Sequence, residues 1–290
     1  MRGLHGRRVP RHKGGLLVTD LHNHPDKAVS IDYLVEICTH GIIGFSHHPV
    51  HARVMGFEEA ISALCDTIEQ NKRKDLCIEV LEPGLARITH DSTSGERVGY
   101  AVNTQEVIAG MYHILAVGCP EILPKYTNPL EAVEAIHSYG GLAILNHPFW
   151  ISKHYWFGEL NGPWSIENAD GATVRAFEQL CEKVDAIEVF NAQFTLSKRV
   201  NDMAKSIARD LGKPGVFCSD SHPKQYSEFT VGVYLDVPNS GLTIEYINES
   251  IARGEFEPSE ERYVSPAVVV LTNGLLLLEG KLRNVGFFRE

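Results

Sequence analysis

Short histidine-containing strings follow several apolar runs of the chain, and two of these strings share one spacing. His22 and His24 lie two residues apart shortly after an apolar run. Asp220 and His222 repeat that spacing after another apolar run, much later in the sequence. Side chains at positions i and i+2 of a β-strand point to the same face. Each pair therefore directs two metal-binding side chains toward one point from a strand end, which is typical of a polynuclear metal site.

Strand-like and helix-like segments alternate along the chain. Short apolar runs predict strands over residues 16–20, 41–46, 78–81, 111–117, 142–145, 186–190 and 215–218. Apolar residues at helical spacing predict helices over residues 30–40, 57–74, 130–138, 173–183, 196–211 and 243–253. This alternation predicts a parallel sheet or barrel with its helices outside. The histidine strings would then lie where strand ends meet loops, which is where such barrels carry their chemistry.

Composition restricts the class of protein and of partner. The chain has 290 residues, 43% of them hydrophobic and 22% charged, as in ordinary globular domains. Its formal net charge of −10 argues against attraction to long nucleic acid or to an anionic membrane. The basic tail over residues 1–15 lacks the apolar stretch of a secretory signal, and no segment is apolar enough to span a membrane. We therefore expect a cytoplasmic protein. Its cysteines form no CxxC pair, so we expect them to be free thiols.

The order of these strings resembles that of the PHP (polymerase and histidinol phosphatase) family. The resemblance covers residues 16–255 and rests on the strings DLHNH, GFSHH, MYHIL, LNHP, IEVFN and CSDSH. Members of that family are distorted seven-stranded β/α barrels that hold two or three metal ions and hydrolyse phosphate esters. The resemblance thus implies a single α/β domain, a distorted (β/α)7 barrel over residues 16–290, with an aromatic insertion near 150–171.

Carried over residue by residue, the resemblance implies a set of metal ligands. These ligands are His22, His24, His48, His113, His147, Asp220 and His222. The family also has a Gly-x-Glu string whose glutamate bridges two metals, and Ala86 stands where that glutamate is expected. We expect the nearby Glu82, or a water molecule, to fill the position. Imidazole combined with a few carboxylates suits zinc, manganese or iron, so two or three such divalent ions are expected.

Other residues of the same strings are candidates for the reaction. Glu188 lies in the predicted strand 186–190 and Asn191 follows it, and both would add polar groups to the same rim. Arg199 and Lys224 follow ligand-bearing strands and are candidate phosphate-binding cations. Asp220 or His222 would also handle the proton of the reaction. The remaining histidines, such as His137 at a helix end, are interpreted as structural or solvated.

We predict a metal-dependent phosphoesterase that hydrolyses a small phosphorylated metabolite or a short nucleotide through a metal-bound hydroxide. Three alternatives stay open at this stage. A phosphodiesterase or oligonucleotide exonuclease would use the same residues and stack bases on Trp150, Trp156 and Trp164. An amidohydrolase-like metal hydrolase also begins with an HxH string on a barrel strand. A catalytically degenerate barrel would bind metal or ligand without turnover.

Overall fold

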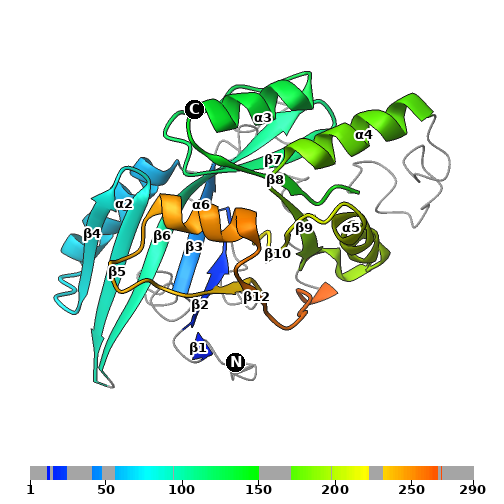
Figure 1. Ribbon diagram of the computed structural model, residues 1–290. Helices are drawn as coiled ribbons and strands as arrows, with labels where there is room; N and C mark the ends of the chain where they lie inside the picture. Colours follow the sequence, from blue (N-terminus) through cyan, green and yellow to red (C-terminus); the bar gives the residue numbers. More distant parts are fainter. Residues whose placement is uncertain are drawn as a thin grey trace, which may run out of the picture.

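A mixed sheet of twelve strands forms the body of the part of the chain that the structure describes (Figure 1). The computed structural model describes residues 12–13, 16–24, 41–47, 56–93, 95–149, 171–196, 198–221, 231–266 and 269. Its strands are β1 (His12–Lys13), β2 (Leu16–Asp20), β3 (Gly41–His47), β4 (Leu76–Glu82), β5 (Leu85–Ser92), β6 (Gly95–Ala109), β7 (Tyr112–Val117), β8 (Leu142–Asn146), β9 (Ala186–Asn191), β10 (Gly215–Cys218), β11 (Val233–Leu235) and β12 (Glu257–Pro258). Its helices are α2 (Phe57–Gln70), α3 (Pro129–Ser138), α4 (Gly171–Lys183), α5 (Arg199–Asp210), α6 (Ile244–Arg253) and the 3₁₀ turn η2 (Phe194–Leu196).

The sheet bends into a nearly closed barrel. Its central path runs in the order β10, β9, β8, β7, β6, β3, β2. The two ends of this path meet just beyond β2 and β10, where Asn23 and Ser221 form an isolated parallel bridge. At the same place the backbone N–H of His24 donates to the carbonyl of Ser221 at 2.9 Å. The distorted α/β barrel expected from the sequence is therefore confirmed.

Between β10 and β2 one strand runs against the others, and beyond β2 the path continues with β11, which pairs antiparallel with β2. The neighbours β2 and β3, β3 and β6, β8 and β9, and β9 and β10 are parallel. By contrast, β7 is antiparallel to both β6 and β8. The turn at Gly110 and Met111 joins β6 to β7, and so short a connection can only produce an antiparallel pair. The amino end of β7 therefore lies at the same end of the barrel as the carboxyl ends of its neighbours.

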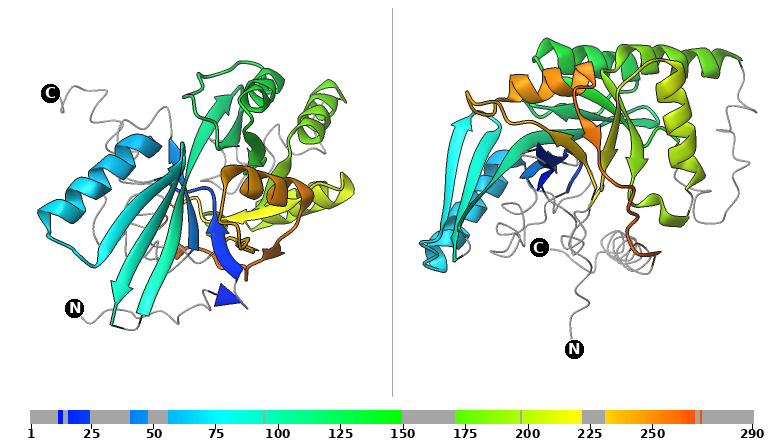
Figure 2. Two further views of the ribbon diagram at one scale, coloured as in Figure 1. Left: turned by 60° about the vertical axis from the view of Figure 1, so that its left-hand side comes forward. Right: turned by 60° about the horizontal axis from the view of Figure 1, so that its bottom comes forward.

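Two strands extend the sheet beyond the barrel. β4 and β5 form an antiparallel hairpin, and β5 continues the pairing onto the long strand β6. Helix α2 covers one face of this extension (Figure 2) and buries Phe57, Ala60 and Leu64 against it. The sequence analysis predicted only a short strand here and missed β5 and β6. The buried stretch Thr104–Glu106 is polar, so an apolar run was a poor guide to β6.

The helices on the outside of the barrel begin and end where their sequences favour it. The Asn128 side chain accepts from the N–H of Leu130 at 3.0 Å, and Pro129 occupies the first turn of α3. Thr243 caps α6 in the same way, and Gly254 ends it in the left-handed conformation. Figure 1 shows α3, α4 and α5 lying outside the sheet, as predicted. No helix among the described residues is long and apolar enough to cross a bilayer.

Some predicted segments fall outside the described residues. These segments are the helix over 30–40, the aromatic insertion up to residue 170, and most of the basic tail over 1–15. Within that tail, residues 12 and 13 form β1, which pairs antiparallel with the start of β2.

Candidate metal centre

Imidazole and carboxylate side chains from most of the barrel strands meet at one end of the barrel. The residues that meet there are His22, His24, Glu106, His113, His147, Glu188 and Asp220. Three overlapping triplets have ligand atoms within 4.8 Å of one another: His22, His24 and Glu106; His22, His147 and Glu188; and Glu106, His113 and His147. All of these triplet residues are buried except His113, which is partly exposed. A buried cluster of this composition could hold one or more divalent metal ions.

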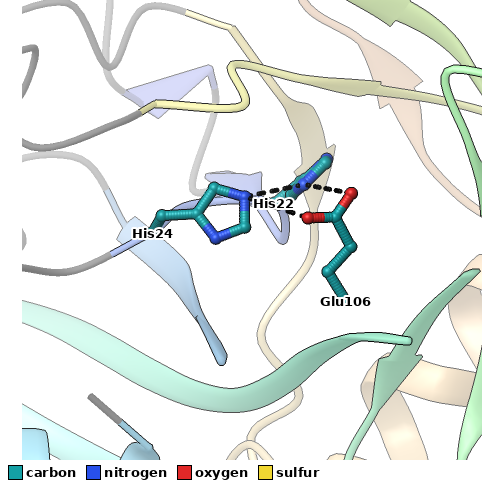
Figure 3. Close-up of side chains that lie close together, drawn as sticks. All are labelled: His22, His24 and Glu106. Atoms are coloured by element: carbon teal, nitrogen blue, oxygen red, sulfur yellow. Dashed lines mark hydrogen bonds and ion pairs between the residues drawn. The ribbon is translucent and has the colours of Figure 1, made fainter. Parts of the chain in front are cut away.

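Glu106 lies at the middle of the cluster and faces two sets of histidines. Its Oε1 atom lies 2.6 Å from Nδ1 of His113 and 3.1 Å from Nε2 of His147. Its Oε2 atom lies 3.5 Å from Nε2 of His24. Figure 3 shows the carboxylate facing the rings of both His22 and His24. Nε2 of His22 lies 3.8 Å from Oε1, so the carboxylate lies between His22 and His24 on one side and His113 and His147 on the other.

His22, His24 and Asp220 form the other half of the cluster. The two imidazole Nε2 atoms lie 3.1 Å apart. The Oδ1 atom of Asp220 lies 3.4 Å from Nε2 of His22 and 3.3 Å from Nε2 of His24. Asp220 and His147 also have positive φ angles, 50° and 24°, which non-glycine residues rarely adopt. Such backbone strain is concentrated at functional sites, where the surrounding structure holds it in place.

The outward-facing nitrogens of His22 and His24, which follow β2, have partners that fix the ring protons. Nδ1 of His22 lies 3.0 Å from Oε1 of Glu188, and Nδ1 of His24 lies 3.2 Å from the carbonyl of Ser46. Because both partners accept, each Nδ1 carries the proton when the ring is neutral. Each Nε2 then presents a lone pair to the cluster. This is how a second layer of side chains prepares histidine to bind a metal.

The charges of the cluster are strongly coupled. Burial by itself lowers the pKa of His22, but the negative charges of Asp220 and Glu188 hold that pKa well above its usual value. Burial raises the pKa of Glu106, but the charge of His113 and hydrogen bonds from His113 and His147 bring it well below its usual range. The carboxylates thus keep cationic partners beside them in a buried site. A divalent cation would take the place of the ring protons beside these carboxylates, with the imidazoles neutral and their inward nitrogens free to bind it.

The structure brings together most of the predicted ligands that it describes. His22, His24, His113, His147 and Asp220 all lie in the cluster. His48, His222 and Lys224 fall outside the described residues. Arg199 begins α5, after the carboxyl end of β9, and its side chain is exposed.

Glu82 was expected in the bridging role, and the structure places it elsewhere. It ends β4, and its Oε1 accepts from the N–H of Ile244 at 2.6 Å, so it caps the amino end of α6. Ala86 is fully buried in the apolar contact between the hairpin and α2, so a glutamate there would not reach the cluster. Glu106 occupies the central position instead. No apolar run marks Glu106 in the sequence, because the stretch Thr104–Glu106 of β6 is buried but polar.

Comparisons with known proteins give little further guidance. No protein-family model matches the chain, and no curated protein matches its sequence. Among solved structures, the chain is similar to PfuEndoQ, a lesion-specific endonuclease from Pyrococcus furiosus, with a TM-score of 0.48 and 14% identity. The match covers 87% of this chain and 60% of that one, so this chain spans less than two thirds of that protein's length.

Proposed function

We propose that this chain is a metal-dependent hydrolase of phosphate esters. The observation that supports it best is Glu106, whose two oxygens face different histidines inside a buried cluster. Paired metal sites bridged by one group suit an in-line displacement at phosphorus, because they neutralise charge on both the attacking and the leaving oxygen.

Some residues of the cluster would bind the metal ions, and others orient these ligands through hydrogen bonds. His22, His24, Glu106, His113, His147 and Asp220 would hold the ions, together with His48 and His222. A bound divalent ion supplies Lewis acidity, which lowers the pKa of a water molecule and stabilises negative charge on phosphoryl oxygens. Glu188 and the Ser46 carbonyl keep the ring protons away from the ligand nitrogens.

Asp220 is the carboxylate best placed to exchange a proton with the reacting groups. Its side chain is 13% exposed, whereas those of Glu106 and Glu188 are 3% and 0% exposed. We further propose a small phosphorylated metabolite or a short nucleotide as substrate, because the net charge of −10 disfavours a long polyanion.

A substrate panel tests this proposal. The protein is reconstituted with Zn²⁺, Mn²⁺ or Fe²⁺ and assayed on a phosphomonoester, a phosphodiester, a short oligonucleotide and a cyclic amide. We expect turnover of a phosphate ester that a chelator abolishes and added metal restores. Turnover of the amide alone would favour an amidohydrolase. Tight metal binding without turnover of any substrate would favour a degenerate barrel.

Arg199 is expected to act on the substrate and not on the metal. A guanidinium group binds phosphate oxygens but cannot ligate a metal ion. Arg199→Ala should therefore raise KM for a phosphate ester about tenfold or more, since hydrogen bonds to charged groups contribute about 1.5–3 kcal/mol. Metal content should stay unchanged, and we expect Lys224→Ala to behave alike. Arg209→Ala, in the last turn of the same helix, is the matched control with unchanged kinetics. Equal KM values in all variants would leave phosphate binding to the metal ions.

A further inference from the structure

We propose that Asn191 is a positioning residue that aligns the ligand Asp220 and the orienting carboxylate of Glu188. This inference rests on the proposed metal site and not on the identity of the substrate. Nδ2 of Asn191 donates to Oε2 of Glu188 at 3.1 Å and to Oδ2 of Asp220 at 3.1 Å. A primary amide carries two N–H groups, so each carboxylate receives one of them.

The two carboxylates that Asn191 contacts both act on His22. Because Asn191 binds Oδ2 of Asp220, the other oxygen of that carboxylate is turned toward Nε2 of His22, 3.4 Å away. Glu188 directs its Oε1 to Nδ1 of the same ring at 3.0 Å. A single amide group thus contacts both carboxylates that flank His22, and the N–H of His147 donates to the same Oε2 of Glu188 at 2.6 Å.

Asn191 is itself held in one orientation. Its Oδ1 accepts from the N–H of Gln193 at 2.9 Å, so the amide group must turn its N–H groups to the carboxylates. Asn201 on α5 fixes the backbone: its Oδ1 accepts from the N–H of Asn191, and its Nδ2 donates to the carbonyl of Asn191, both at 3.1 Å. Asn191 and Asn201 are 1% and 2% exposed, so water does not compete for these bonds.

Asp220 needs such a partner because the sheet does little to place it. β10 ends at Cys218, and its register with β9 shifts between Val216 and Phe217. On the other side, the bridge at Ser221 and two hydrogen bonds of Ser219, to the side chains of Asp20 and Asn23, join this segment to the end of β2. Asp220 also holds a left-handed backbone conformation, with φ at 50°. The side chains of Asn191 and Gln193, which donates to the Asp220 carbonyl at 3.0 Å, therefore locate this ligand.

A double-mutant cycle on metal affinity tests the proposal. Zn²⁺ affinity is measured by competition with a chromophoric chelator for the wild type, Asn191→Leu, Asp220→Ala and the double variant. Removing an outer partner of a ligand typically costs 10–100-fold in metal affinity, so Asn191→Leu should weaken Zn²⁺ binding by about that factor. If Asn191 acts through Asp220, the loss in the double variant is smaller than the product of the two single losses. An unchanged affinity in Asn191→Leu, or losses that multiply fully, would overturn the proposal.

Two further variants separate positioning from a general role in folding. Asn191→Ser keeps a hydroxyl that can accept from the N–H of Gln193, but it is too short to reach both carboxylates, so it should lose affinity as well. Asn103→Leu is the matched control, because it also removes a partly buried amide donor, to the Cys119 carbonyl, away from the cluster. It should lower the Tm of the metal-free protein without changing Zn²⁺ affinity.

The outcome for the wild type keeps this inference distinct from the proposed function. Wild-type protein that binds Zn²⁺ tightly but hydrolyses no phosphate ester would overturn the proposed function and leave the role of Asn191 standing. Wild-type protein that takes up no Zn²⁺ would overturn both. A loss of Tm in Asn191→Leu without any loss of affinity would show that Asn191 serves only the turn at Gln193, where its Oδ1 accepts from the N–H of Gln193.

Discussion

Glu106→Gln is expected to release about one equivalent of bound metal and to lower kcat/KM for a phosphate ester by more than about a hundredfold. Mutating even an outer partner of a ligand typically costs about 10–100-fold in metal affinity or activity, so loss of a ligand should cost more. A glutamine has one neutral carbonyl oxygen, so it cannot offer one anionic oxygen to each of two ligand sets. The side chain would also leave Nδ1 of His113 and Nε2 of His147 without the carboxylate oxygen that lies 2.6 and 3.1 Å from them. Elemental analysis and steady-state kinetics measure both effects.

Glu82→Gln is the matched control for that substitution. The amide oxygen of glutamine can still accept from the N–H of Ile244 at the start of α6. The variant loses only the favourable charge at a helix amino end, worth about 0.3–1 kcal/mol of stability. Its metal content and kinetics should match the wild type. The reverse result, with Glu82→Gln inactive and Glu106→Gln normal, would restore the bridging role that the sequence alone assigned to Glu82.

The contrast between these two glutamates shows how far the sequence could lead. Several ligands closely follow apolar strands, namely His22, His24, His147 and Asp220. A pattern of this kind involves only neighbouring residues, so it can be recognised in the sequence. These residues could therefore be placed at one rim before the structure was known. The alternation of strands and helices predicted a parallel sheet or barrel, and the family resemblance of the same strings implied its distorted form.

Glu106 could not be found in that way because its position depends on pairing between distant segments. Glu106 lies in the long strand β6, whose buried side chains are partly polar. The sequence around it therefore has no continuous apolar run that would predict a strand. Its approach to His113 depends on the reversal of β7, which follows from the tight turn at Gly110. An all-parallel barrel places the beginning of each strand at the far end from the ligands. Only the antiparallel β7 brings His113 to the same rim.

The contacts of Asn191 illustrate a second limit of the sequence. An asparagine at the end of a strand indicates a polar rim, but not which groups it orients. The groups that Asn191 orients depend on the register between β9 and β10. They also depend on Asn201 of α5, whose side chain bonds both the N–H and the carbonyl of Asn191. Side chains that align ligands are spread over several elements, so no short string identifies them.

His22→Ala is expected to abolish metal binding and activity together while the barrel remains folded. His22 belongs to two of the three ligand triplets and lies within 3.4 Å of Asp220, so its loss opens both halves of the cluster. A ligand present at 100 times its Kd stabilises a protein by about 2.7 kcal/mol, and Zn²⁺ should therefore raise the Tm of the wild type by several degrees. His22→Ala should show the far-UV circular dichroism of the wild type and no rise in Tm with Zn²⁺.

His137→Ala is the control for His22→Ala because it removes an imidazole that has a carboxylate partner but lies outside the cluster. His137 lies in the last turn of α3, 40% exposed, with Nε2 at 2.8 Å from Oδ2 of Asp185. The pair is mostly solvated, so its loss should lower stability only slightly, and the rise in Tm with Zn²⁺ should equal that of the wild type. His22→Asn serves where His22→Ala is too unstable, since its amide can replace Nδ1 as the donor to Glu188 but offers no imidazole nitrogen to the cluster. If His22→Asn gained as much thermal stability from Zn²⁺ as His137→Ala does, the metal would have to bind elsewhere in the chain, and the cluster around Glu106 would lose its assigned role.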